Sequence, residues 1–117
     1  MNLRATIALL LAACMFTVQA QTMFRGDAAR RGTTSEAAPR TLAGVKWSFQ
    51  TGERIVSSPV AHAGTVYFGS DDGQVYALDA ASGRLRWAWR TGGPVPSTPA
   101  VHDGRVFVAS YDGRLHA

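Results

Sequence analysis

The chain has 117 residues, of which 46% are hydrophobic and 17% charged, a balance typical of folded globular chains and unlike that of disordered ones. Twelve glycines and five prolines indicate many tight turns, which favours strands over helices. The net charge of +4 raises nucleic acid as a partner. The twelve basic residues are scattered, however, and only Arg30 and Arg31 are adjacent, so we expect a solvated surface and no nucleic-acid site.

Residues 1–20 have the order of a secretory signal peptide. Arg4 supplies early positive charge, residues 5–16 form an uncharged apolar run, and residues 18–20 end on the small Ala20 that a signal peptidase recognises. The apolar run is shorter than the roughly 20 residues of a membrane-spanning helix. We therefore expect an exported, periplasmic protein whose mature chain begins after Ala20.

The single cysteine, Cys14, leaves a second outcome open. Residues 11–13 and Cys14 resemble a bacterial lipobox, in which the cysteine is acylated and becomes the new N-terminus. The apolar stretch continues past Cys14 and a good cleavage site follows at Ala20, which favours ordinary cleavage. Lipidation would anchor the protein to the outer membrane without altering its fold. In either case no disulfide, cysteine metal site or catalytic thiol is expected.

The C-terminal part of the chain repeats itself. Residues 21–45 are small, polar and basic, which predicts an extended lead-in, whereas an offset of 40 positions aligns 47–77 with 87–117 without a gap. A gap-free repeat of this length is typical of a β-propeller, which has four strands per blade. Twelve of the 31 aligned pairs are identical: Trp47/Trp87, Thr51/Thr91, Gly52/Gly92, Ser57/Ser97, Pro59/Pro99, His62/His102, Gly64/Gly104, Val66/Val106, Ser70/Ser110, Asp72/Asp112, Gly73/Gly113 and Ala77/Ala117.

Each repeat has the pattern of antiparallel strands joined by tight turns. In the turn at 70–73, Asp72 and Gly73 are expected to supply the positive φ angles of a hairpin. On the last strand Leu85, Trp87 and Trp89 are predicted to share one face, at period 2. The predicted strands cover 57–61, 65–70, 74–78 and 84–91, and the remaining turns 62–64 and 80–83.

These strands predict an all-β fold, a β-propeller of four-stranded antiparallel blades that is incomplete. Residues 57–91 form a first blade, and 97–117 the first three strands of a truncated second blade. Residues 46–50 align with a fourth strand and are predicted as a closing strand, which in a complete ring pairs with the last blade. Because propellers have about 4–8 blades, we expect an N-terminal fragment of a longer protein.

The segment 77–87 resembles the tryptophan-docking motif of the pyrroloquinoline quinone (PQQ) repeat family, Ala-x-Asp-x-x-Thr-Gly-x-x-x-Trp. The opening at 23–27 is also similar to that of secreted PQQ-like proteins. The resemblance implies that the tryptophans, Trp47 and Trp87, pack between blades while the Asp and Ser side chains hold the turn. The matching residues are Ala77, Asp79, Ser82 (in place of Thr), Gly83 and Trp87.

The resemblance implies one of two functions. Quinoprotein dehydrogenases are eight-bladed enzymes that hold PQQ and calcium on the propeller axis, whereas propellers such as the outer-membrane assembly lipoprotein BamB bind protein partners and no quinone. Short turns without a vicinal cysteine pair or an inserted loop favour the second branch. We therefore expect a non-catalytic scaffold in the bacterial cell envelope, with protein partners and without catalytic, cofactor or metal residues in this chain. A PQQ-dependent oxidoreductase is the alternative.

Two further patterns favour structural interpretations. His62 and His102 occupy equivalent turn positions one blade apart, which predicts repeated turn residues and not a metal pair. Residues 71–73 are rich in oxygen atoms but lack the alternating carboxylates and distal Glu of an EF-hand loop, which favours a hairpin.

Overall fold

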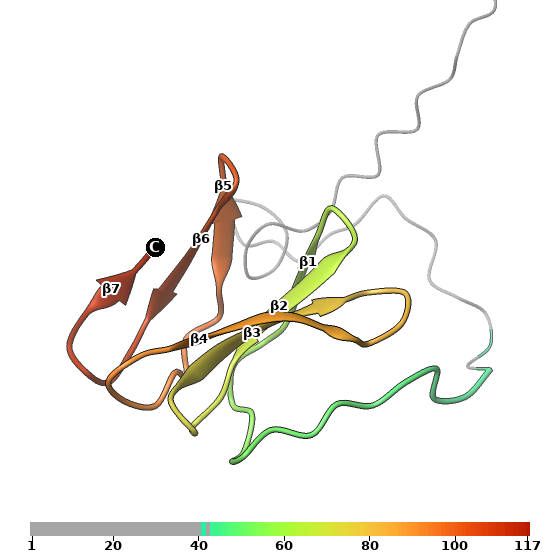
Figure 1. Cartoon of the computed structure of the whole chain (residues 1–117), viewed down its shortest axis with the longest axis horizontal. Coiled ribbons are helices and arrows are strands. Elements are labelled where there is room, and N and C mark those ends of the chain that lie inside the picture. The colour runs from blue at the N-terminus through green and yellow to red at the C-terminus, as the bar shows by residue number, and fades with distance from the viewer. Residues whose placement is uncertain (1–40, 42) are drawn as a thin grey trace, which may run out of the picture.

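The computed structural model describes residue 41 and residues 43–117; the predicted signal peptide, Cys14 and nearly all of the lead-in lie outside them. The described residues form strands and no helix, arranged as two antiparallel sheets (Figure 1). The first sheet has the order β1 (Val60–His62), β2 (Thr65–Gly69), β3 (Gln74–Asp79) and β4 (Leu85–Arg90). The second has the order β5 (Ala100–His102), β6 (Arg105–Ala109) and β7 (Leu115–His116).

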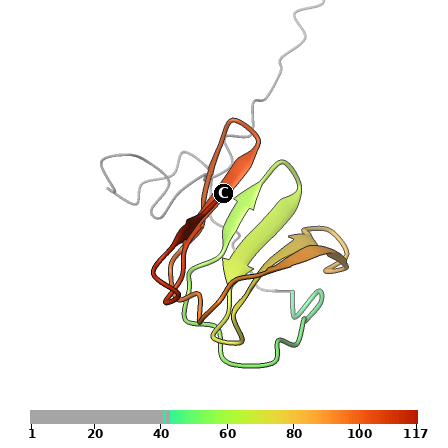
Figure 2. The same cartoon turned by 60° about the vertical axis from the view of Figure 1, so that its left-hand side comes forward.

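The second sheet repeats the first at the 40-residue offset. Val60 pairs with Tyr67 in the first sheet, and Ala100 pairs with Phe107 in the second. The innermost strands β1 and β5 lie side by side (Figure 2). This confirms the all-β fold class and agrees with two neighbouring blades of a partial propeller; the described residues form no closed barrel.

The tightest hairpins are not at the position that the sequence predicts. Ala63 and Gly64 both have positive φ (46° and 73°), as type I′ turns require. In the turn at 70–73 only Gly73 has positive φ (83°), and its N–H donates to Ser70 O, so Asp72 does not supply a second such angle. The first strand accordingly continues through His62, which ends β1 instead of lying in the turn.

Both faces of the central strand β3 are covered. Tyr76 and Leu78 are buried with Phe68 on one face, which we call the lead face because residues of the opening segment 46–50 cover it. On the other face, Val75 is buried with residues that precede and form the second sheet, namely Val95, Val106 and Val108. The first blade therefore has its core on two sides, as a blade inside a propeller does.

The opening segment 46–50 is extended along the lead face but is not assigned as a strand. Trp47 and Phe49 are half-buried against the sheet, while Ser48 between them is exposed. This alternation fits a strand, but no described strand pairs with the segment, since the first sheet ends at β1 and β4. Its role as a closing strand stays a prediction.

The predicted common face of Leu85, Trp87 and Trp89 is interrupted by a β-bulge. Ala77 pairs with Trp87, but the next residue of β3, Leu78, pairs with Leu85, so Arg86 is the extra residue. Because neighbouring residues of β3 point to opposite faces, the register puts Leu85 on the lead face and Trp87 with Trp89 on the opposite one.

Candidate functional site

The predicted docking motif centres on the turn that joins β3 to β4. Asp79 Oδ1 accepts hydrogen bonds from Ala81 N (3.1 Å), Ser82 N (2.9 Å) and Ser82 Oγ (2.9 Å). Gly83 N donates to Asp79 O (2.8 Å), and Gly83 has a φ of +71°, which a residue with a side chain rarely adopts. The turn is thus held by the carboxylate and closed by the glycine.

Trp47 lies on this turn. Its Nε1 donates to Ala80 O (3.1 Å), and its ring packs against the buried cluster of the lead face. A Cβ added to Gly83 would come within 2.5 Å of Trp47 Cδ2, so the ring occupies the space of the missing side chain. The structure therefore brings Trp47, from the preceding repeat position, together with the Asp79–Gly83 turn of the first blade.

The second predicted docking tryptophan, Trp87, lies apart from that turn. It belongs to the opposite face, where its ring centroid is 5.9 Å from that of Tyr67, and its exposed fraction is 40%. Ala77 pairs with both Tyr67 and Trp87 in the neighbouring strands, so the small side chain stands between two aromatic rings. Ala77 is completely buried there.

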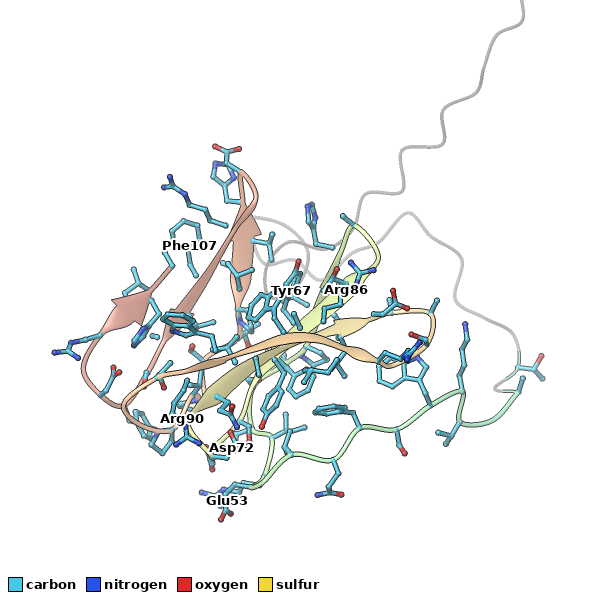
Figure 3. The ribbon with its side chains drawn as sticks, in the orientation of Figure 1. Glu53, Tyr67, Asp72, Arg86, Arg90 and Phe107 are labelled. Carbon is cyan, nitrogen blue, oxygen red and sulfur yellow. The ribbon has the colours of Figure 1, made fainter. Side chains whose placement is uncertain are left out.

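Arg86 completes the motif, and sequence reasoning missed it. Its Nη2 lies 2.6 Å from Asp79 Oδ2 and its Nη1 donates to Thr65 Oγ1 (2.7 Å), so that it projects toward β2 (Figure 3). This ion pair and the Ser82 N–H hold the pKa of the Asp79 carboxyl well below its usual range. The available signal was the basic residue before each repeated tryptophan, Lys46 and Arg86.

A second carboxylate position recurs in both blades. Asp72 accepts from Gly52 N (3.0 Å), Gln74 N (2.9 Å) and the Tyr76 hydroxyl (2.6 Å). Partial burial raises the Asp72 pKa, but these hydrogen bonds, that of Tyr76 first, leave it lowered overall, while burial and Asp72 raise the pKa of Tyr76 to about 12. Figure 3 shows Asp72 at the same end of the sheet as Glu53. The carboxylate thus ties the 51–54 turn to β3.

In the second blade Asp112 has the same role with different partners. It accepts from Gly92 N (2.8 Å) and Arg114 N (2.9 Å), and His116 Nε2 lies 2.8 Å from its Oδ2, where Asp72 has the Tyr76 hydroxyl. The Gly92 hydrogen bond lowers the Asp112 pKa most, and with the contribution of His116 it falls from 3.8 to about 2. Asp112 therefore links the segment between the blades to β7.

This lowered pKa predicts an acid-side loss of stability that Asp112→Asn reduces. The folded-state pKa is below the unfolded one, so the stabilisation is complete above about pH 4 and disappears as the pH falls through about 2. We expect the melting temperature of the parent chain to fall more steeply between pH 4 and pH 2 than that of the variant. Asp103→Asn is the matched control, because Asp103 is 86% exposed and bonds no backbone N–H of the neighbouring blade. Equal slopes for all three proteins would contradict the prediction.

The repeated hydroxyls also bond to backbone groups. Ser57 Oγ donates to Gly69 O (2.9 Å) and accepts from Gly69 N (2.8 Å), and Ser97 makes the same pair of bonds to Ala109. Ser110 Oγ lies 3.1 Å from Thr91 Oγ1, across the two blades. The serine, threonine and aspartate side chains that the two repeats share therefore hold strands and blades together.

A surface groove of about 190 Å³ lies beside the equivalent turns 70–73 and 110–113 of the two blades. Tyr111, on one side, is 77% exposed, and Val56 is 57% exposed. Arg54 and Asp71 form an ion pair in the same groove, next to the exposed apolar side chains. The lining residues are Arg54, Val56, Asp71, Pro94, Pro96 and Tyr111.

A larger groove of about 440 Å³ lies between β4 and the second sheet. Trp87 and Trp89 line it from β4, and its polar side chains are Arg105 and His116. No Asp or Glu side chain is among the residues that line this groove. Within 43–117 no three His, Cys, Asp or Glu side chains are grouped as metal ligands, and His62 and His102 form no such cluster.

A four-stranded and a three-stranded antiparallel sheet that repeat one pattern, share the same hydrogen-bonded polar residues and carry a docked tryptophan define a β-propeller repeat protein. A family model described as outer membrane protein assembly factor BamB matches residues 29–117. The chain belongs to this family of PQQ-like repeat proteins. Among curated proteins none matches the chain. In the described residues no helix is long and apolar enough to cross a membrane.

Proposed function

We propose that the protein is a non-catalytic scaffold that binds protein partners in the bacterial cell envelope. The observation that carries the proposal is that the serine, threonine and aspartate side chains shared by the repeats bond to the backbone of their own or the neighbouring blade. These side chains therefore have structural roles. The family description, an outer membrane assembly factor, supports the envelope location.

Export by the 1–20 leader is part of the proposal, with cleavage after Ala20 or lipidation of Cys14 as its two routes. The mass of the mature chain distinguishes them, because lipidation retains residues 14–20 and adds acyl groups. We further propose that the chain binds no cofactor. The PQQ-dependent alternative has less support, because the chain has only short turns, without a vicinal cysteine pair or an inserted loop.

The groove at Tyr111 is where we expect a partner to bind, because it combines exposed apolar side chains with an ion pair. A photo-crosslinking amino acid placed at position 111 in cells is expected to give one defined adduct with an envelope protein. The same amino acid at Arg84, an exposed residue of the docking turn, is the matched control and is expected to give none.

One combination of results would contradict the scaffold proposal. If position 111 gives no adduct, and the purified protein binds PQQ in the presence of calcium with a measurable heat, the scaffold proposal is wrong and the oxidoreductase is favoured.

A further inference from the structure

The turn between β5 and β6 consists of Asp103 and Gly104, and we call it the 103–104 turn. It lies at the tip of the second sheet (Figure 1). Both residues have positive φ, 47° and 71°, a conformation that few residues other than glycine adopt. In the equivalent turn of the first blade Ala63 stands in place of Asp103, so this carboxylate is not part of the repeated architecture.

The carboxylate of Asp103 has a single partner among the described residues, the ring of His102. The Asp103 Oδ2 and His102 Nε2 atoms lie 3.3 Å apart, and the two side chains are 86% and 80% exposed. An ion pair in such an exposed position contributes little, because water competes for both groups. No hydrogen bond from the described residues therefore fixes the carboxylate.

The backbone N–H of Gly104 is also without a partner in the described part of the chain. The strand pairing of the hairpin begins at His102 and Arg105, so Gly104 lies outside the ladder, and no turn hydrogen bond involves it. Its missing side chain leaves the nitrogen open to approach. A carboxyl group and the unhindered amide nitrogen of the next residue are the two reactants of succinimide formation.

The carboxylates of the two other Asp-Gly sequences, 72–73 and 112–113, are held in place. Asp72 accepts hydrogen bonds from two backbone N–H groups and from the Tyr76 hydroxyl. Asp112 likewise accepts from two backbone N–H groups. Such hydrogen bonds stabilise the ionised carboxylate, which loses an oxygen less readily than the neutral acid does.

The glycine amides of these two sequences are engaged as well. Gly73 N donates to Ser70 O and Gly113 N donates to Ser110 O, each at 3.2 Å. Both reactants are thus occupied by hydrogen bonds at 72–73 and 112–113. The 103–104 turn is the place in the described chain where both are available.

We propose that Asp103 is a site of spontaneous isoaspartate formation, with the Gly104 nitrogen as the nucleophile. The nitrogen attacks Asp103 Cγ, an N–Cγ bond forms and a Cγ–O bond breaks, and the oxygen leaves as water with the amide proton and the carboxyl proton. Water then opens the five-membered succinimide. Attack at Cγ restores aspartate, whereas attack at the main-chain carbonyl gives isoaspartate, whose backbone runs through Cβ and Cγ.

The position of the turn favours the reaction and gives it a consequence. Exposed turns at the tip of a hairpin open locally at low free energy, which allows the nitrogen to reach Cγ. The product adds one carbon to the main chain between the paired residues His102 and Arg105. Because β5 lies beside β1, the change acts where the two blades meet.

Ageing of the whole chain at neutral pH and body temperature tests the proposal. Trypsin separates the three Asp-Gly sequences, because arginines place them in the peptides 55–84, 91–105 and 106–114. Methylation by an isoaspartyl methyltransferase detects the product, and electron-transfer fragmentation locates it. We expect isoaspartate to accumulate several-fold faster at Asp103 than at Asp72 or Asp112.

Asp103→Glu is the matched control, because it keeps the charge but would have to close a six-membered ring; its peptide 91–105 is expected to stay unmodified. Ageing in guanidinium chloride is the second control. There the three sequences are expected to react at similar rates, because unfolding releases the hydrogen bonds of Asp72 and Asp112. Equal rates in native buffer would overturn the proposal. A difference that persists in guanidinium chloride would also overturn it, since the neighbouring residues in the sequence and not the fold would then set the rates.

Discussion

Replacing Gly69 with Ala is expected to lower the free energy of unfolding by about 2–3 kcal/mol, the upper part of the range for overpacking a well-packed core. Gly69 ends β2 where the first blade meets the segment that leads to the second. An added Cβ would lie 2.5 Å from Val95 Cγ1 and would overlap the Val95 carbonyl oxygen. Val95 is fully buried and its N–H donates to Ser70 O (3.0 Å), so the backbone has little room to retreat.

The chain contains its own control for this substitution, because the residue equivalent to Gly69 in the second blade is Ala109. Ala109 is the last residue of β6 and is exposed, so its side chain meets no neighbouring blade within the described residues. Ala109→Gly is therefore expected to cost only about 0.5–1 kcal/mol, the entropic penalty of a strand glycine. Urea unfolding followed by far-UV circular dichroism measures both changes. Faster hydrogen exchange at the Val95 amide in Gly69→Ala, and not in Ala109→Gly, would locate the damage between the blades.

The strands and their order could be predicted from the sequence, because each repeat alternates β-branched residues with Gly-containing turns. The faces of β4 could not. One extra residue, Arg86, moves Leu85 to the opposite side from Trp87, and a bulge leaves no mark in an alternating pattern. The same limit applies to Ala63, whose positive φ of 46° is imposed by the hairpin and not favoured by an alanine side chain.

The repeat also could not predict how deeply residues at equivalent positions are buried. Ile55 and Val95 are aligned, yet Ile55 is 46% exposed and Val95 is fully buried, because within the described residues only Val95 has a blade on both sides. The docking motif shows the same dependence on neighbours. Its residues Asp79 and Gly83 could be identified from their spacing, but the sequence did not indicate that the tryptophan on their turn is Trp47 and not Trp87.

Trp47→Ala is expected to destabilise the first blade by about 3 kcal/mol, the low end of the range for truncating a packed tryptophan, because the ring is half-buried. Its loss exposes part of the Phe68, Tyr76 and Leu78 cluster and removes the hydrogen bond to Ala80 O. Trp47→Phe keeps a packed ring and loses that bond, so about 1 kcal/mol is expected. Urea unfolding at one low protein concentration gives both values.

Trp87→Ala is the matched control, because Trp47 and Trp87 occupy equivalent positions of the repeat. Within the described residues, only Trp47 lies on a docking turn. Trp87 is 40% exposed and its main aromatic neighbour is Tyr67, at 5.9 Å, so about 1 kcal/mol is expected from the lost aromatic pair. Equal losses for the two variants would mean that the Asp79–Gly83 turn adds nothing to the tryptophan it holds. A threefold larger loss for Trp47→Ala would instead show that the tryptophan of the preceding repeat stabilises the blade on which it docks. Docking would then be a property of neighbouring blades and not of one blade alone.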